Sequence, residues 1–292
     1  TGRFNRKWVL LGLMTLFVAG NLLAWQAPGY GSLITARILT GLAHGVFFSI
    51  GSTIATSLVA KDKEASAIAI MFTGLTVALV TGVPLGTWIG QHFGWRATFL
   101  VVSVLGLLAL IGSAILVPNN LKKSVPATFA QQLKVLTHPR LLLVYLITIL
   151  GYGGTFTAFT YLAPLLQDVS GFNEGAISLI MLVYGISVAI GNIQGGKLAD
   201  RMGPIRALTL IFGGLIVILG VLTFTAANPI TAVITILIWG AFAFGNVPGL
   251  QVYVVQQAER FVPQAVDVAS GLNIAAFNIG IALGSIVGGQ VV

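Results

Sequence analysis

Long apolar runs fill this chain, and short polar breaks separate them. The nine runs lie at about residues 8–25, 31–58, 66–90, 97–117, 141–166, 175–198, 207–226, 230–255 and 268–292. Each is close to or longer than the roughly 20 residues that an α-helix needs to cross about 30 Å of hydrocarbon. The pattern therefore predicts an all-α membrane protein, a bundle of nine membrane-spanning helices.

One break stands apart from the others by its length. Most breaks are short and contain the proline, glycine and charged residues that favour turns. The break at residues 118–140, in contrast, is long and contains four lysine or arginine residues. We therefore predict an incomplete N-terminal bundle at residues 1–117, a central loop at 118–140 and an incomplete C-terminal bundle at 141–292.

The composition supports a membrane protein and excludes several other classes. Only 8% of the residues are charged and 57% are hydrophobic, whereas about a quarter of a soluble domain is charged. Lipid must therefore cover most of the surface. The chain has no cysteine, which rules out disulfides and cysteine-based metal sites. We expect no cofactor and no metal, and the net charge of +8 does not predict a nucleic-acid partner.

The basic residues follow the alternation of the predicted spans. If residue 1 is cytoplasmic, thirteen bases fall on the cytoplasmic side, Arg96 alone falls outside, and Arg37 lies within a span. Such an excess is the usual sign of the cytoplasmic face. The chain start and the central loop are therefore predicted to be cytoplasmic. The thirteen are Arg3, Arg6, Lys7, Lys61, Lys63, Lys122, Lys123, Lys134, Arg140, Lys197, Arg201, Arg206 and Arg260.

Similar segments recur about 200 residues apart. TGRFNRK at the chain start aligns with ADRMGPI, so that Arg3 and Arg201 are 198 residues apart. SLVAKDKEASAIAI is likewise echoed by RFVPQAVDVASGLNIA. The spacing indicates two duplicated halves of six spans, as in secondary transporters. By this count two spans before residue 1 and one after residue 292 are expected, so the sequence is read as a fragment.

Several motifs resemble those of the major facilitator superfamily. GGKLADRMGPIR is similar to its cytoplasmic-loop signature, and GRFNRK resembles a first copy with Gly2 in place of Asp and Asn5 in place of Gly. RILTGLAHGVFF resembles the fourth-span motif, and GLTVALVTGVPLGTWIG resembles the fifth-span antiporter motif. The resemblance is closest to the twelve-span drug:proton antiporter family, in the branch with arabinose and sugar efflux permeases.

The resemblance implies a secondary active transporter of the bacterial inner membrane, monomeric and working by alternating access. It implies proton-coupled efflux of a drug, a sugar or a small amphipathic metabolite. The proton-carrying acid of that branch lies in a first span, which this sequence does not contain. A sensor or receptor built on a transporter fold, or a facilitator without proton coupling, stays open as an alternative.

Two further classes are disfavoured. The segment TILGYGG is similar to a potassium-channel filter, but its spacing is wrong by one residue and it lies within a continuous span. An enzyme would need a nucleophile with its base or a set of metal ligands. Neither G-x-S-x-G nor H-E-x-x-H occurs, and the histidines are scattered at 44, 92 and 138.

The charges in GGKLADRMGPIR are predicted to form a conformational latch. Asp200 can accept hydrogen bonds from Arg201 or Arg206, or from the N-terminus of a helix in the opposite half, whose dipole favours an anion. Arg3 belongs to the first copy of the motif, in which Gly2 stands in place of the acid. The two copies are therefore expected to contribute unequally to the latch. The alternative is that Asp200 only offsets nearby bases on a solvated loop.

The run at residues 31–58, which is the fourth of the twelve expected spans, contains two ionisable residues, Arg37 and His44. An arginine in hydrocarbon costs at least about 2.5 kcal/mol, so it is expected to face the bundle interior. Arg37, Gly41, His44 and Phe48 share one helical face, which predicts a strip along a substrate or proton pathway. His44 can change charge near neutral pH, although a neutral structural histidine is the alternative.

The run at residues 66–90, which is the fifth of the twelve expected spans, repeats small residues every four positions. Such a face lets another helix approach closely, and Pro84 kinks the helix by removing an amide donor. We predict tight packing there and a rocking contact between the halves. The small residues are Gly74, Ala78, Gly82, Gly86 and Gly90, with similar sets Ser187, Gly191 and Gly195 in the sixth run and Ala276, Gly280, Gly284 and Gly288 in the last.

Aromatic and amide side chains are the candidates for substrate contact. Tyr152 and Phe156 lie in the fifth run, and Trp239 and Asn246 lie in the eighth. Aromatic walls with few polar groups suit an amphipathic organic molecule. Each side chain could instead face lipid or the core.

Overall fold

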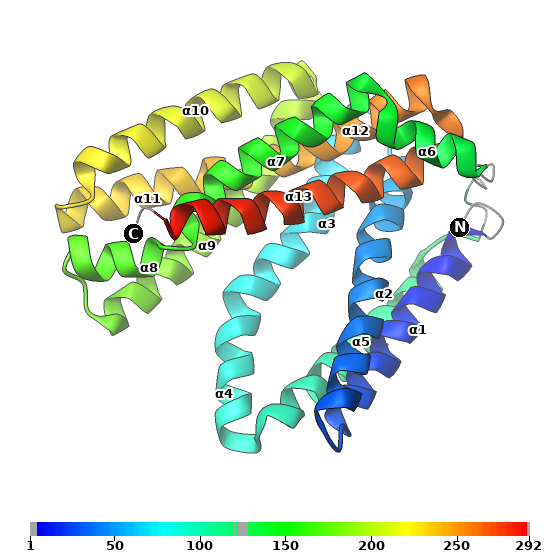
Figure 1. The fold of residues 1–292 in the computed structure, drawn as a ribbon, viewed down its shortest axis with the longest axis horizontal. Helices are drawn as coiled ribbons and strands as arrows, with labels where there is room; N and C mark the ends of the chain where they lie inside the picture. Colours follow the sequence, from blue (N-terminus) through cyan, green and yellow to red (C-terminus); the bar gives the residue numbers. More distant parts are fainter. Residues whose placement is uncertain (1–4, 120, 122–127, 291–292) are drawn as a thin grey trace.

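The computed structural model describes residues 5–119, 121 and 128–290, and these are almost entirely helical. Figure 1 shows the helices as two groups that diverge from a common end. In chain order they are α1 (Arg6–Trp25), α2 (Tyr30–Ser57), α3 (Glu64–Val77), α4 (Val83–Phe93), α5 (Trp95–Leu116), α6 (Phe129–Thr137), α7 (Pro139–Phe159), α8 (Leu162–Pro164), α9 (Glu174–Met202), α10 (Pro204–Thr225), α11 (Pro229–Ala243), α12 (Asn246–Phe261) and α13 (Val266–Gly288).

Short turns of other helix types join several of these elements. They are the 3-10 turns η1 (Lys61–Lys63) and η4 (Pro263–Ala265) and the π-helical turns η2 (Ala78–Gly82) and η3 (Leu165–Val169).

Eight stretches of the described chain are long and apolar enough to cross a membrane. The third predicted span is not among them, because the structure divides it into α3 and α4 with the π-helical turn η2 between. Pro84, near the start of α4, has no amide hydrogen for the regular helical bond. The eight are Arg6–Trp25, Tyr30–Ser57, Trp95–Leu116, Pro139–Val169, Gly175–Met202, Pro204–Thr225, Pro229–Phe261 and Pro263–Gly288.

The turns between helices follow local residue chemistry. Pro139, Pro204 and Pro229 begin α7, α10 and α11, where the missing amide hydrogen has no cost. Gly94 and Gly203 each have φ of +82°, a conformation that favours glycine. These glycines allow α4 to turn directly into α5 and α9 into α10.

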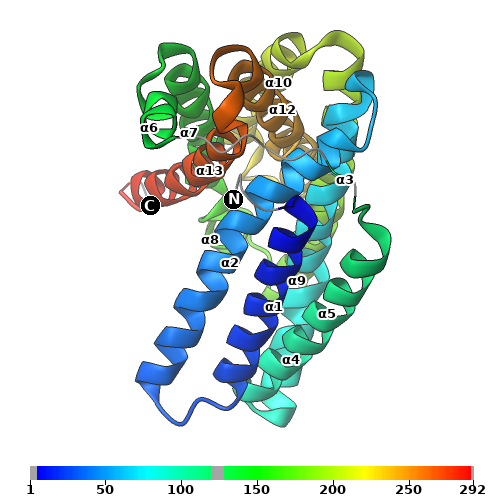
Figure 2. The same cartoon turned by 90° about the vertical axis from the view of Figure 1, so that its right-hand side faces the viewer.

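The helices form two groups, and the division into an N-terminal and a C-terminal bundle stays a prediction. One contains α1, α2, α4 and α5, and the other contains α7 and α9–α13, with α3 reaching from the first to the second (Figures 1 and 2). The groups meet at the end where α1, α3, α7, α10 and α13 begin, called the basic end below for its lysines and arginines. That each bundle moves as a unit stays a prediction.

The glycine faces of the sixth and last runs pack within the C-terminal group rather than between the groups. A Cβ added at Gly280 would lie 2.8 Å from the Ile149 carbonyl oxygen, and one at Gly284 would overlap the backbone of Gly153. Gly191 and Gly195 approach the backbones of Ala241 and Gly245 in the same way. These contacts join α13 to α7 and α9 to the α11–α12 segment.

The glycine face of the run at residues 66–90, now α3, η2 and α4, does not make the predicted helix contact. A Cβ added at Gly74, Gly82 or Gly86 would meet no described atom within 4 Å, and one at Gly90 would be 3.7 Å from the Thr98 side chain. The spacing prediction of tight packing is therefore wrong for this face among the described residues. Gly82 and Gly86 border a cavity instead, so no described helix packs against them.

Candidate functional site

Asp200 joins the two groups of helices at the basic end. Its Oδ1 accepts a hydrogen bond from the Ala65 amide at 2.8 Å, and its Oδ2 accepts one from the Ser66 amide at 2.9 Å. These amides lie in the first turn of α3, where the helix dipole favours a negative charge. Of the partners weighed from the sequence, the structure therefore shows the helix terminus. Arg201 and Arg206 are exposed, and Arg3 lies outside the described residues.

The face of α9 that carries Asp200 contacts α3 over two further turns. Asn192 donates from Nδ2 to the Ala69 carbonyl oxygen at 2.7 Å and to the Thr73 hydroxyl at 3.3 Å. Gly196 lies between, where an added Cβ would be 2.7 Å from the Ala69 Cβ and 2.9 Å from the Ala65 carbonyl oxygen. The two helices thus meet along a face of small and hydrogen-bonding residues, and closing the basic end requires Gly196 to have no side chain.

A charged group lies beside the Asp200 contact. Lys61, Glu64, Gln256, Glu259 and Arg260 line a cavity of about 390 Å³ between the start of α3 and the end of α12. Burial raises the pKa of the Glu64 carboxyl above its ordinary value, and repulsion from Glu259 raises it further. A hydrogen bond with Gln256 and attraction to Lys61 oppose this rise, and the nearby negative charge of Asp200 adds to it.

The raised pKa of Glu64 makes the closed basic end sensitive to pH. The closed arrangement disfavours the charged carboxylate, so lowering the pH towards 4.5, the ordinary pKa of a glutamate, should stabilise the closed arrangement, and raising the pH should weaken it. Spin labels at Lys63 and Arg140, on opposite groups of helices, would report the fraction of closed molecules. Glu64→Gln should reduce the dependence on pH. An unchanged dependence in this variant would assign the titration to another group.

Helices α2 and α13 form a second contact at the basic end. Arg6 and Asp267 form an ion pair with 3.0 Å between Nη2 and Oδ1. The Ser49 hydroxyl donates to the Asp267 carbonyl oxygen, and the Ser270 hydroxyl donates to the Ser49 carbonyl oxygen at 3.4 Å. The basic end is therefore closed at two separate places, at α3 with α9 and at α1–α2 with α13.

Buried polar side chains continue inward from the second contact. Thr148 donates to Asn273 Oδ1 at 2.7 Å, Asn273 donates from Nδ2 to Gln251 Oε1 at 3.0 Å, and Gln251 donates to the Ser270 hydroxyl. All four side chains are fully buried. Because each buried polar group has a partner, the network fixes α7, α12 and α13 relative to one another.

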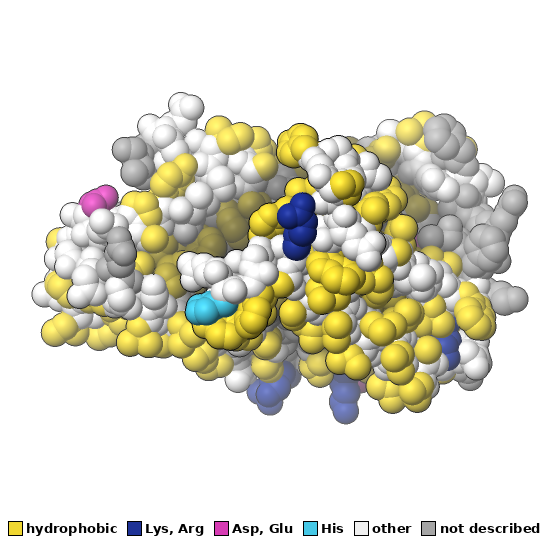
Figure 3. All heavy atoms as spheres, turned by 90° about the horizontal axis from the view of Figure 1, so that it is seen from below, with side chains coloured by type: hydrophobic (Ala, Val, Ile, Leu, Met, Phe, Trp, Pro, Cys, Tyr) yellow, Lys and Arg dark blue, Asp and Glu magenta, His cyan; other side chains and the backbone are white. Residues whose placement is uncertain are grey.

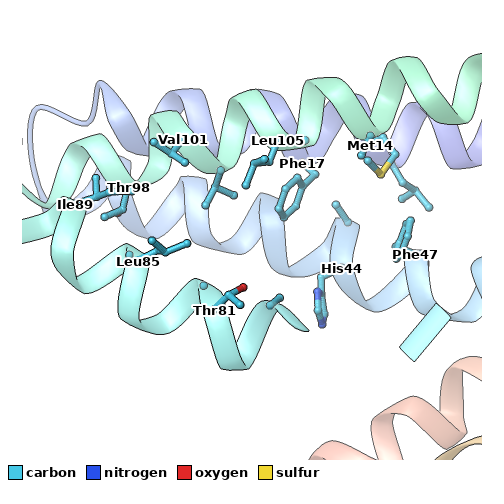
Figure 4. A pocket seen from close by; sticks show the side chains of 18 of the residues that line it. Met14, Phe17, His44, Phe47, Thr81, Leu85, Ile89, Thr98, Val101 and Leu105 are labelled. Atoms are coloured by element: carbon cyan, nitrogen blue, oxygen red, sulfur yellow. The ribbon is translucent and has the colours of Figure 1, made fainter. Parts of the chain in front are cut away.

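The predicted strip on the fourth span is divided in the structure. His44 lines a cavity of about 760 Å³ bounded by α1, α2, η2, α4 and α5, together with Gly82 and Gly86 (Figure 4). Arg37 and Gly41 are not among its lining residues. Arg37 is exposed and lies 6.0 Å from the centre of the Phe99 ring. Arg37 therefore faces α5 rather than this cavity, and a common pathway along Arg37 and His44 stays a prediction.

The cavity beside His44 has mostly apolar walls. Phe17, Leu85 and Leu105 point into it, and Thr81 adds a polar side chain to the lining (Figure 4). The molecule seen from below presents mainly hydrophobic and uncharged side chains around a hollow, with few charged groups (Figure 3). Both surfaces are suited to apolar or amphipathic molecules.

The aromatic candidates of the C-terminal group form one connected cluster. The Tyr152 ring lies 5.0 Å from that of Phe156, 5.4 Å from Phe244 and 4.9 Å from Phe277. Tyr152 is buried, whereas Phe156 is partly exposed. Phe48 of α2 belongs to the same buried cluster. The ring of His44 lies 4.8 Å from that of Phe48, so the two candidate groups meet there.

Three buried polar atoms of this region have no hydrogen-bond partner among the described residues. They are the Tyr184 hydroxyl, the Trp239 indole nitrogen and Asn246 Oδ1. The Tyr184 and Trp239 rings lie 5.3 Å apart, and Asn246 donates from Nδ2 to the Ala243 carbonyl oxygen at 3.0 Å. Sequence reasoning missed Tyr184, because nothing in the local pattern shows which tyrosine on α9 faces α11.

Comparison with known proteins gives consistent results. A family model described as Major Facilitator Superfamily matches residues 1–285. The chain is 57% identical over 291 residues to the "Uncharacterized MFS-type transporter YtbD" of Bacillus subtilis (strain 168), covering 100% of this chain and 73% of that protein. It is 40% identical over 289 residues to the "Inner membrane transport protein YdhP" of Escherichia coli (strain K12), covering 98% and 72%.

The fold has a counterpart among solved structures. A crystal structure of the Escherichia coli fucose:proton symporter FucP matches with a TM-score of 0.74 and 16% sequence identity. The match covers 98% of this chain and 76% of that chain. At this identity the likeness concerns the fold alone.

Proposed function

Because this chain belongs to the major facilitator superfamily of membrane transporters, we propose that it moves a small molecule across the membrane by alternating access. The observation that carries this proposal is the closure of one end by Asp200, a residue of one group of helices, on the first turn of α3 in the other. Such a contact is strong enough to favour one state and can be broken to reach another.

The strength of the Asp200 contact fits a conformational switch. Each hydrogen bond to a charged group contributes about 1.5–3 kcal/mol, and the states of a switching protein differ by a few kcal/mol. Loss of the two bonds is therefore sufficient to change which end is open. Arg201 and Arg206 are exposed bases that follow Asp200 in the chain. In this proposal they act together with Asp200, as Arg3 does in the first copy.

The substrate in this proposal is a small, uncharged or amphipathic molecule with hydrogen-bond acceptors. Residues 207–258 contain no Asp, Glu, Lys or Arg. Trp239 is fully buried in this arrangement of the helices, so in this proposal it reaches the ligand in another state of the transport cycle, through its aromatic face and its dipole. Tyr152 and Phe156 supply aromatic area, and Trp239, Tyr184 and Asn246 supply unpaired polar atoms. Sugars and neutral drugs fit this description.

Protons are the coupling ion in this proposal, and export is the direction of transport. Histidine is the side chain that ordinarily titrates near neutral pH, and His44 lies in the cavity of the N-terminal group, with Arg37 further along the same helix. The excess of bases supports a basic end on the cytoplasmic side of a bacterial inner membrane. A transporter-fold sensor is the second candidate, favoured by the division of the Arg37–His44 strip.

Transport measurements on the protein reconstituted in liposomes test the proposal. Exchange of radiolabelled neutral sugars and amphipathic drugs, with and without a pH gradient, should identify a substrate that the gradient drives. Trp239→Phe replaces the indole with a smaller aromatic ring that has no N–H, so KM for that substrate should rise about tenfold. Trp8→Phe, at an exposed tryptophan, is the control. Absence of any flux, despite correct insertion, would favour the sensor.

A further inference from the structure

A groove of about 270 Å³ lies where α9, α10 and the α11–α12 segment meet. Its floor consists of residues with little or no side chain, because the backbones of α9 and α11–α12 approach each other closely there. A Cβ added at Gly191 would overlap the Ala241 backbone, and one at Gly195 would overlap the Gly245 backbone. The interruption between α11 and α12 falls at the same place, so the three segments leave a hollow between them.

One end of this groove is basic. Lys197 and Arg201 line it as exposed side chains on one face of α9. Neither forms an ion pair with any residue that the structure describes. Asp200, next to Arg201 in the chain, accepts its hydrogen bonds from α3 instead. The described lining contains no acid, so both positive charges are available to an anionic ligand.

The rest of the groove is apolar and follows a membrane-spanning stretch. Ile190, Ile211 and Phe242 line it, and the α9 residues belong to the apolar stretch Gly175–Met202. From Arg201 to Ile190 the helix rises about 16 Å at 1.5 Å per residue, which is close to half of the roughly 30 Å of hydrocarbon in a bilayer. The groove therefore extends over about one leaflet, whereas a small anion would occupy only its basic end.

We propose that this groove binds an anionic phospholipid, with the headgroup phosphate at Lys197 and Arg201 and one acyl chain along Ile190 and Phe242. Basic pockets between membrane-spanning helices bind lipid headgroups, and long basic side chains near a helix end reach the membrane surface. The apolar wall covers part of the acyl chain. The site is independent of the proposed transport function, and it can be measured without a substrate.

Quenching of a fluorophore by brominated acyl chains tests the proposal, because the chain has no cysteine of its own. Bimane on Ile190→Cys reports on lipid in the groove. Bimane on Ile216→Cys, at an exposed position equally far from the basic end of α10, reports on lipid elsewhere at the same depth. Both proteins are reconstituted in vesicles of phosphatidylcholine with increasing mole fractions of a brominated lipid.

The groove should select the anionic lipid. At Ile190, brominated phosphatidylglycerol should reach half-maximal quenching at about one tenth of the mole fraction that brominated phosphatidylcholine requires. At Ile216 the two lipids should require the same mole fraction. Equal mole fractions at Ile190, or the same preference at both positions, would overturn the site.

Charge variants assign the preference to the two bases. Lys197→Gln leaves the Asp200 contact intact and should reduce the preference to about threefold, and Lys197→Gln with Arg201→Gln should abolish it. Lys63→Gln with Arg140→Gln removes two exposed bases of the same end and should keep the parent value. Parent-like quenching at Ile216 shows that each variant is inserted.

Two further results would exclude a lipid held by these bases. The first is a full preference for phosphatidylglycerol in the variant that lacks both Lys197 and Arg201. The second is loss of the parent's preference when millimolar inorganic phosphate is added, which would assign the basic end of the groove to a small anion. A preference that withstands phosphate and disappears with the two bases supports the phospholipid site.

Discussion

Replacing Asp200 with asparagine is expected to open the basic end. The variant keeps the shape of the side chain and removes the charge that two α3 amides stabilise. Loss of about 2 kcal/mol changes the ratio of closed to open molecules about 30-fold. A cysteine at Thr73, on the face of α3 that Asn192 contacts, should be labelled correspondingly faster. Substrate transport should fall while insertion and abundance stay near normal.

The control for this experiment is another charge at the same end. Lys63→Gln removes an exposed base of η1 and should change neither labelling nor transport. Arg201→Ala should shift labelling in the same direction as Asp200→Asn, and the double variant should show less than the sum if the two residues act together. Unchanged labelling in Asp200→Asn would show that its hydrogen bonds do not hold the end closed.

Gly196→Leu is expected to prevent the basic end from closing. A Cβ at this position would lie 2.7 Å from the Ala69 Cβ and 2.9 Å from the Ala65 carbonyl oxygen. The obstacle includes the backbone of α3, so the two helices must separate to admit the leucine, at a cost of about 1–3 kcal/mol. Transport should be lost, and the Thr73 reporter should become at least about tenfold more reactive.

A glycine in an open environment provides the matched control. Gly220 of α10 would meet no described atom within 4 Å if it carried a Cβ, so Gly220→Leu adds the same side chain without an obstacle. It should retain transport and parent-like labelling. Equal loss in both variants would indicate a general effect on insertion, whereas full activity in Gly196→Leu would show that the close approach of α9 and α3 is dispensable.

The positions of the helices could be predicted from the sequence because they depend on local properties. The length of each apolar run sets a span through its transfer into lipid, and a proline directly after a turn favours the first position of a helix. Pro139, Pro204 and Pro229 illustrate this. The division of the third span at η2 was not predicted, since a π-helical turn depends on small differences in backbone hydrogen bonding.

Asp200 illustrates which part of the candidate site could be predicted from the sequence. An acid at the end of an apolar run, among bases and glycines, was recognisable as a latch residue. Its partners were left open between Arg201, Arg206 and a helix terminus. The amides that it binds belong to Ala65 and Ser66, 135 and 134 residues away. Only the packing of α9 against α3 decides between these partners.

Residue spacing alone could not show what each helical face contacts. Gly82 and Gly284 occur in similar four-residue repeats, yet Gly82 borders a cavity and Gly284 packs on the Gly153 backbone. Arg37 and His44 share a helical face in the sequence, but one lies beside Phe99 and the other lines the cavity. The sequence by itself determined most of the membrane-spanning runs and the acid Asp200 at the end of one of them, since burial in lipid and helix-end chemistry act over a few turns. The tertiary structure decided which faces meet, because that choice depends on the packing of segments more than a hundred residues apart.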